Sequence, residues 1–184
     1  MTTTGSHSLR HSLAVAAAAA LLVGCADGTP LPSEPEAASS AQFASALSAG
    51  DGAVIATLRR VTAPYHNIDK AIADGFVLLA ECEVRPGHGE AGTLYVNFNH
   101  VLDGIIDPEK PEGLLYDASG NGPPNLVGVD LAVPYALWTE TEPPEFLGVT
   151  FQREDEFGAW ALHVWIWRHN PEGMFAEGHP NVSC

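Results

Sequence analysis

From Gly75 onward the sequence is a series of short apolar runs separated by Gly, Pro and Asn. Runs of roughly four to eight residues between such turn residues are typical of β-strands. They predict strands at residues 76–83, 93–98, 113–116, 126–133, 147–151 and 160–167. We expect these strands to form an antiparallel sheet.

Two helical stretches precede the strands, at residues 53–62 and 67–73, with Pro64 between them and Asp51 as the expected N-cap of the first. Helices followed by a run of strands are typical of an α+β fold. The chain of 184 residues is too short for two substantial domains. We therefore predict one α+β domain over residues 51–184, in which N-terminal helices pack on the antiparallel sheet.

The N-terminus has the pattern of an export signal. Arg10 precedes an unbroken apolar run at residues 13–23, and no acidic residue lies in this part of the chain. A helix that crosses a hydrocarbon core of about 30 Å needs roughly 20 apolar residues, so this run is too short for a transmembrane anchor. Residues 1–24 are predicted to be a signal peptide.

The apolar run ends in Leu22-Val23-Gly24-Cys25, which resembles the bacterial lipobox. The resemblance implies that the chain is cleaved before Cys25 and that Cys25 carries diacylglycerol, so that membrane lipid is a partner through acyl chains. An ordinary secretory signal with a chance cysteine is the alternative. Residues 25–50 are rich in Pro and poor in large apolar residues, and are predicted to be a flexible tether.

Charge excludes one class of partner. The formal net charge is −15, and it becomes −16 when residues 1–24 are removed, because they contain Arg10 and no acid. Nucleic-acid binding requires clustered Lys and Arg. We expect no nucleic-acid partner, and an acidic domain held by lipid on the extracytoplasmic side of a membrane in the bacterial cell envelope.

Two cysteines, Cys82 and Cys184, remain after Cys25 is acylated. Export places them in an oxidising compartment, where two cysteines suffice for one disulfide. A redox or metal-binding thiol pair is the alternative, but neither cysteine belongs to a C-x-x-C motif.

The strand at residues 160–167 alternates between two kinds of side chain. Leu162, Val164 and Ile166 lie on one face with period two, and the other face carries His163, Trp165 and Trp167. The second face is either part of the core or the wall of a binding pocket that stacks a ring or a sugar.

A metal site would need further ligands beside His163. The candidates are His88, His100 and Asp130, although no histidine pair has H-x-H or H-x-x-x-H spacing. A transition-metal site is therefore only weakly indicated.

Calcium is also weakly indicated. Asp117, Ser119 and Asn121 imitate the first half of a calcium loop, but the twelfth position is Gly128 instead of Glu. A hairpin turn at Asn121-Gly122 explains the same residues.

Three functions remain open. The first is a non-enzymatic domain that binds a small molecule or an envelope protein through His163, Trp165 and Trp167. The second is a metal-dependent enzyme or metal carrier that uses His163. The third is a structural envelope protein with a filled core on both faces of the sheet. The domain has no G-x-S-x-G motif and no unassigned cysteine, so enzymatic activity is the less expected outcome.

Several segments together resemble an uncharacterised family of small exported bacterial proteins. They are YHNIDKAIADGF at residues 65–76, YVN at 95–97, DPEKPEGLLY at 107–116, LVGVDLAVP at 126–134 and the tail LHVWIWRHNPEGMFAEGHPNVSC at 162–184. The resemblance brings no activity, but it implies pairing of Cys82 with Cys184. It also implies a partner histidine for His163, where this chain has Leu94.

Overall fold

A computed structural model describes residues 48–85 and 87–183, which begin with helix α2 (Ala49–Thr62) and its capping box. The hydroxyl of Ser48 accepts the backbone N–H of Asp51 at 3.2 Å, and the Asp51 carboxylate accepts the N–H of Ser48 at 2.7 Å. The N-cap is therefore Ser48, and Asp51, predicted in that role, is the third helical residue.

Proline ends this first helix as expected. Pro64 lies in a short 3-10 helix, η1 (Ala63–His66), and Asn67 caps the next helix, α3 (Ile68–Ala73), by accepting the N–H of Asp69 at 3.0 Å. A proline has no N–H to donate and cannot continue an α-helix.

Six antiparallel strands form the main sheet, in the order β1-β2-β3-β4-β8-β7. Their bounds are β1 (Val77–Arg85), β2 (Gly89–Val96), β3 (Gly113–Asp117), β4 (Asn125–Pro134), β7 (Gln152–Glu154) and β8 (Ala159–Val164). One short helix, α4 (Phe98–Val101), connects β2 to β3. The strands are joined mainly to their sequence neighbours, so the sheet is built from local hairpins.

The strand predicted at residues 147–151 takes a different form. Its residues are divided between a small hairpin of β5 (Glu145–Phe146) and β6 (Val149–Thr150) and the stretch before β7. The chain reverses at Leu147 and Gly148, which have φ values of 52° and 77°. Positive φ values are incompatible with a continuous strand.

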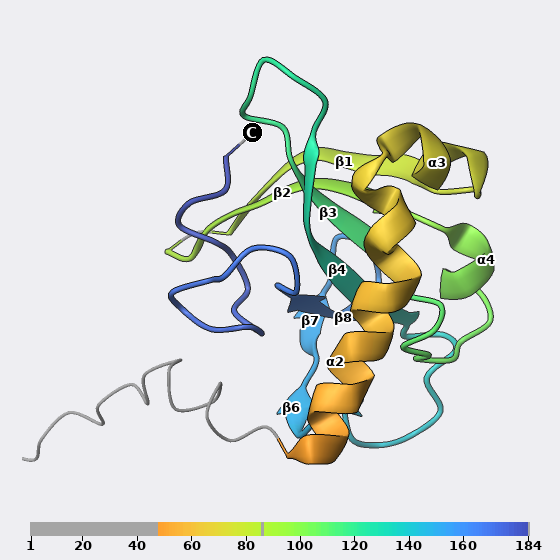
Figure 1. The fold of residues 1–184 in the computed structure, drawn as a ribbon. Coiled ribbons are helices and arrows are strands. Elements are labelled where there is room, and N and C mark those ends of the chain that lie inside the picture. The colour runs from red at the N-terminus through yellow and green to blue at the C-terminus, as the bar shows by residue number, and fades with distance from the viewer. Residues whose placement is uncertain (1–47, 86, 184) are drawn as a thin grey trace, which may run out of the picture. The chain divides into compact units, whose positions relative to one another are not determined.

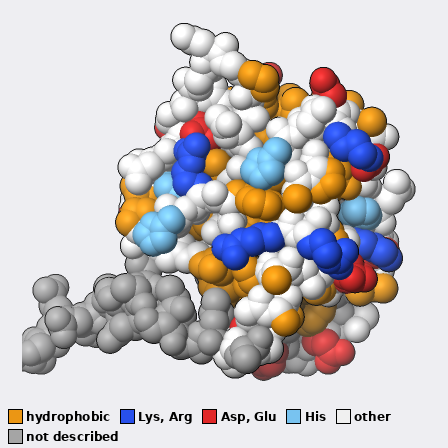
Figure 2. Space-filling model, viewed as in Figure 1, with side chains coloured by type: hydrophobic (Ala, Val, Ile, Leu, Met, Phe, Trp, Pro, Cys, Tyr) orange, Lys and Arg blue, Asp and Glu red, His pale blue; other side chains and the backbone are white. Residues whose placement is uncertain are grey.

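One face of the sheet packs against α2, which crosses in front of it in Figure 1. Ile55 and Leu58 from α2 are buried with alternate residues of the central strands, such as Leu114, Val129 and Leu162. Figure 2 shows the same view, in which Lys and Arg side chains are spread over this helical face. The main core therefore lies between the helices and the sheet.

The opposite face of the sheet has a smaller core of its own. Leu94, Leu115, Val127 and Trp165 pack together there with Val182 from the C-terminal tail. Both sets of alternating side chains on the central strands are thus buried, as the strongly apolar sequence of these strands requires.

The predicted α+β class is confirmed: N-terminal helices pack on an antiparallel sheet, and all of the described residues belong to one compact unit. The predicted disulfide lies outside the described residues, because they exclude Cys184 and the side chain of Cys82. The lipid site at Cys25 lies outside them too. Within the described part of the chain, no helix is long and apolar enough to cross a membrane.

Candidate functional site

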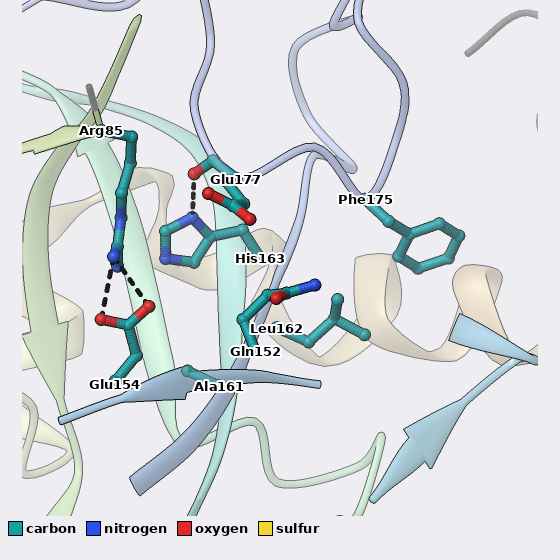
Figure 3. Close-up of a pocket in the computed structure, with 8 residues that line it drawn as sticks. All are labelled: Arg85, Gln152, Glu154, Ala161, Leu162, His163, Phe175 and Glu177. Atoms are coloured by element: carbon teal, nitrogen blue, oxygen red, sulfur yellow. Dashed lines mark hydrogen bonds and ion pairs between the residues drawn. The ribbon is translucent and has the colours of Figure 1, made fainter. Parts of the chain in front are cut away.

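The two edge strands of the main sheet are linked by an ion pair across the face that α2 does not cover. Arg85 ends β1, and its Nη1 donates to both carboxylate oxygens of Glu154 on β7, at 2.7 and 2.8 Å. Figure 3 shows these side chains approaching each other from their two strands. Because β1 and β7 are the first and last strands of the sheet, the pair requires the sheet to curl, which makes this face concave.

Strand register places two further polar groups side by side on this concave face. In successive strands, Val96 pairs with Gly113, Gly113 with Asp130, and Asp130 with His163. Side chains of directly paired residues point to the same face of a sheet. A Cβ atom at Gly113 would lie 2.8 Å from the Cβ of Asp130, so glycine leaves the space that the Asp130 side chain occupies.

The imidazole of His163 is held in one tautomer. Its Nδ1 lies 2.6 Å from the carbonyl oxygen of Glu177 (Figure 3), which can only accept a hydrogen bond. Nε2 lies 3.9 Å from Oδ1 of Asp130. Burial, followed by the nearby Arg85 cation, lowers the pKa of His163 to about 4. At neutral pH His163 is therefore an uncharged imidazole whose Nδ1 carries the proton.

An apolar cavity of about 140 Å³ opens on the concave face. Its large side chains are Leu79, Leu94, Val96, Phe98, Val101 and Phe157. Small residues such as Ala132 and Ala161 leave room between them, and the ionisable side chains in its wall are those of Arg85, Asp130 and Glu154. For comparison, an apolar cavity of about 150 Å³ can hold a benzene molecule.

The mouth of the cavity is apolar and exposed to solvent. Leu79, Phe98 and Phe157 retain 37%, 47% and 39% of their accessible surface, whereas Asp130 retains 4%. Apolar side chains that are exposed together around one opening are typical of an interaction or ligand-binding site. Asp130 is thus buried in the wall, whereas apolar side chains are exposed at the edge of the cavity.

The two tryptophans predicted to share a face with His163 are separated in the structure. Trp165 is buried behind the tail and donates its indole N–H to the carbonyl oxygen of Ala176 at 2.7 Å. Trp167 packs on the helical side, where its indole N–H donates to the Thr62 hydroxyl at 3.1 Å. The alternation does not reach Trp167 because β8 ends at Val164.

Hydrogen bonds to the C-terminal tail account for its distinctive sequence. Three successive backbone carbonyls, at residues 176, 177 and 178, accept hydrogen bonds from Trp165, His163 and Asn170. The buried ring of His179 contacts the carbonyl oxygen of His169 at 3.1 Å. These residues fix the tail against the sheet, so their residue types follow from hydrogen bonding within the fold.

The metal candidates are only partly brought together. The structure places Asp130 beside His163, whereas His88 lies 4.0 Å from the carboxylates of Glu172 and Glu177. His100 is on α4, with its Nδ1 2.9 Å from the carbonyl oxygen of Pro111. Among residues 48–85 and 87–183, no group of three or more His, Cys, Asp or Glu side chains is arranged to hold a metal ion.

The calcium-like segment makes protein contacts of its own. The carboxylate of Asp117 pairs with Arg168 and accepts the N–H of Ser119 at 3.0 Å. Asn121 and Gly122 lie in the connection between β3 and β4, where a hairpin turn was the alternative prediction.

Sequence reasoning did not identify Arg85, Glu154 or Glu112. Glu154 belongs to a run of acidic residues that is typical of a solvated turn. The sequence signal that could have identified this site is Arg85, the one basic residue in the stretch that forms β1. Glu112 lies immediately before β3 and is 1% exposed. Its Oε2 accepts the N–H of Ala132 on β4, close to the point where Gly113 pairs with Asp130.

Comparison of the chain with protein-family models, with curated proteins and with solved structures found no match.

Proposed function

We propose that this protein is a lipid-anchored, extracytoplasmic domain that binds a small molecule in the cavity on the concave face of its sheet. The observation that carries the proposal is the cavity of about 140 Å³, with exposed apolar side chains at its edge and a small number of ionisable side chains in its wall. Ligand sites typically combine an apolar lining with a few polar groups that orient the ligand.

The cavity favours binding over a purely structural role. A structural domain would be expected to fill both faces of its sheet, because close packing of the core adds stability. The core on the concave face fills only part of it, and the small side chains of Ala132, Ala159 and Ala161 line the open space of the cavity.

The residues proposed to bind the ligand are those of the cavity wall, and the predicted Trp165 and Trp167 are not among them. Trp165 and Trp167 donate their indole N–H groups to protein oxygens, which is typical of tryptophans that complete a core. Asp130 lines the cavity directly, and His163 supports it from the neighbouring strand.

The anchor and the disulfide complete the proposal. The lipobox-like sequence before Cys25 supports lipid attachment, and export supports a bond between Cys82 and Cys184. The predicted tether between Cys25 and the N-cap of α2 at Ser48 would let the binding domain stand away from the bacterial envelope membrane that holds it.

Binding of a neutral aromatic probe tests the function. The full chain is placed in phosphatidylcholine vesicles and titrated with benzyl alcohol by calorimetry, with empty vesicles as the blank. We expect saturable binding that is lost in Ala132→Leu, which fills the cavity, and kept in Ala136→Leu, which adds the same atoms at an exposed position outside it. No saturable binding, or equal binding in both variants, would contradict the proposal.

A further inference from the structure

The cavity on the concave face is long for its volume. Its wall includes Asp130, Ala132 and Pro134, which alternate along β4, and this row spans about 13 Å at the rise of a β-strand. The volume of about 140 Å³ is close to that of a cavity that holds benzene, which corresponds to roughly six carbon atoms. Space for so few atoms along such a row is narrow.

Small side chains form the floor of this narrow space. Ala132 on β4 pairs directly with Ala161 on β8, and Pro134 pairs with Ala159. Side chains of directly paired residues point to the same face of a sheet, and all four of these residues line the cavity. Two successive pairs of small residues therefore leave a straight trough that runs along the strands.

The smaller core closes the inner side of the trough. Leu94 and Val96 belong both to that core and to the cavity wall, and they are only 2% and 4% exposed. The mouth is formed by side chains that remain exposed, such as Phe98 and Phe157. A ligand can thus place an apolar end against Leu94 and Val96 and keep a polar end at the mouth.

The ionisable side chains of the wall have partners within the protein. Arg85 donates to both carboxylate oxygens of Glu154. Asp130 approaches His163 and has a further interaction within the protein. The surface that the wall offers to a ligand is mainly apolar. A sugar would leave its hydroxyl groups against this surface, which is unfavourable.

We infer that the ligand is a single-chain amphiphile, and that about six carbons of its unbranched alkyl chain lie in the trough with the polar end at the mouth. This inference rests on the proposed function, because it names the chemical class of the molecule that the cavity binds. Binding is reversible and involves no covalent step.

Two alcohols with the same six carbons and one hydroxyl group test the shape of the ligand. The full chain in phosphatidylcholine vesicles is titrated by calorimetry with n-hexanol and with neohexyl alcohol, which is branched. Empty vesicles give the partition of each alcohol into lipid, and affinities refer to the aqueous concentration. We expect n-hexanol to bind at least tenfold more tightly. Equal affinities, or tighter binding of the branched alcohol, would overturn the inference.

A series of unbranched alcohols tests the depth of the trough. From n-butanol to n-hexanol the affinity should rise about fourfold with each added CH₂ group, as expected when that group is fully buried. From n-hexanol to n-octanol it should rise less than twofold for each group, because the trough is full. A steady rise through n-octanol that parallels partition into empty vesicles would contradict this arrangement.

A matched pair of variants locates the inner end of the chain. Val96→Ala removes two carbon atoms from the inner wall, so the affinity should keep rising to about eight chain carbons. Val84→Ala is the same substitution at a residue of β1 that is 60% exposed and lies outside the cavity wall, and its limit should stay at about six. An unchanged limit in Val96→Ala, or the same shift in both variants, would overturn the assignment of the inner end.

The probes also separate the two proposals. If benzyl alcohol binds saturably but the branched and unbranched alcohols bind equally, the proposed function stands and the inference fails. If neither benzyl alcohol nor any other alcohol binds the wild-type protein saturably, both fail. If Val96→Ala does not fold, the comparison of the two six-carbon alcohols on the wild-type protein decides the inference.

Discussion

Glu112 should make the stability of this protein fall as the pH rises. Burial raises the pKa of its carboxyl group from 4.5 to about 8, and the carboxylates of Asp103 and Asp107 add to this effect. Oε2 accepts the N–H of Ala132 at 3.1 Å, and Oε1 has no hydrogen-bond partner among the described residues. The folded protein therefore keeps Glu112 protonated at pH values where the unfolded chain releases the proton.

The sign and size of the effect follow from proton binding. Between pH 4.5 and about 8 the folded state holds a proton that the unfolded state lacks, so unfolding releases a proton and becomes easier as the pH rises. Each pH unit in this interval lowers the free energy of unfolding by about 1.4 kcal/mol. The stabilisation that comes from keeping Glu112 protonated is complete below pH 4.5 and is lost as the pH rises to about 8. Over this interval the free energy of unfolding falls by about 5 kcal/mol.

The variant Glu112→Gln isolates this contribution, because an amide has nearly the shape of the protonated acid and does not ionise. Urea unfolding of both proteins from pH 4.5 to 9 should give similar free energies at the acidic end. The variant should be more stable by about 5 kcal/mol at the basic end. Glu140→Gln, at an exposed position, controls for the loss of one negative charge. A difference between wild type and Glu112→Gln that does not change with pH would refute the reasoning.

Two further predictions concern the fold. Gly92 has a φ of 84°, and a Cβ there would collide with the carbonyl oxygen of Tyr116, so Gly92→Ala should destabilise the domain by at least about 2 kcal/mol in urea unfolding. Gly122, with nothing within 4 Å of its Cβ position, is the matched control, and equal losses in the two variants would contradict this explanation. In the mature protein, iodoacetamide should label Cys82 and Cys184 only after reduction, as peptide mass spectrometry can measure. Labelling of either cysteine before reduction would exclude the disulfide.

Much of the fold could be predicted from local patterns. The strands at β1, β3 and β4 begin and end within a few residues of the predicted ranges, because turn residues bound each apolar run. The end of β8 could not be predicted. The apolar pattern continues through Trp167, whereas the backbone leaves the sheet after Val164 to join the tail.

The candidate site depended on information that the sequence does not carry locally. Asp130 and His163 were both candidates, but their adjacency follows from the register between β4 and β8. Arg85 and Glu154 are 69 positions apart and meet because the whole sheet curls. Contacts between the two edges of a sheet depend on the geometry of every strand pair between them, so no local sequence motif predicts them.

Photolabelling tests the central claim, that the concave-face cavity is a binding site. A benzyl alcohol that bears a diazirine is irradiated with the full chain in phosphatidylcholine vesicles, and the labelled peptides are identified by mass spectrometry. We predict labels at the mouth and wall of the cavity, on Leu79, Phe98 or Phe157, that excess benzyl alcohol removes. Labels confined to the helical face around α2, or labels that excess benzyl alcohol does not reduce, would contradict the account.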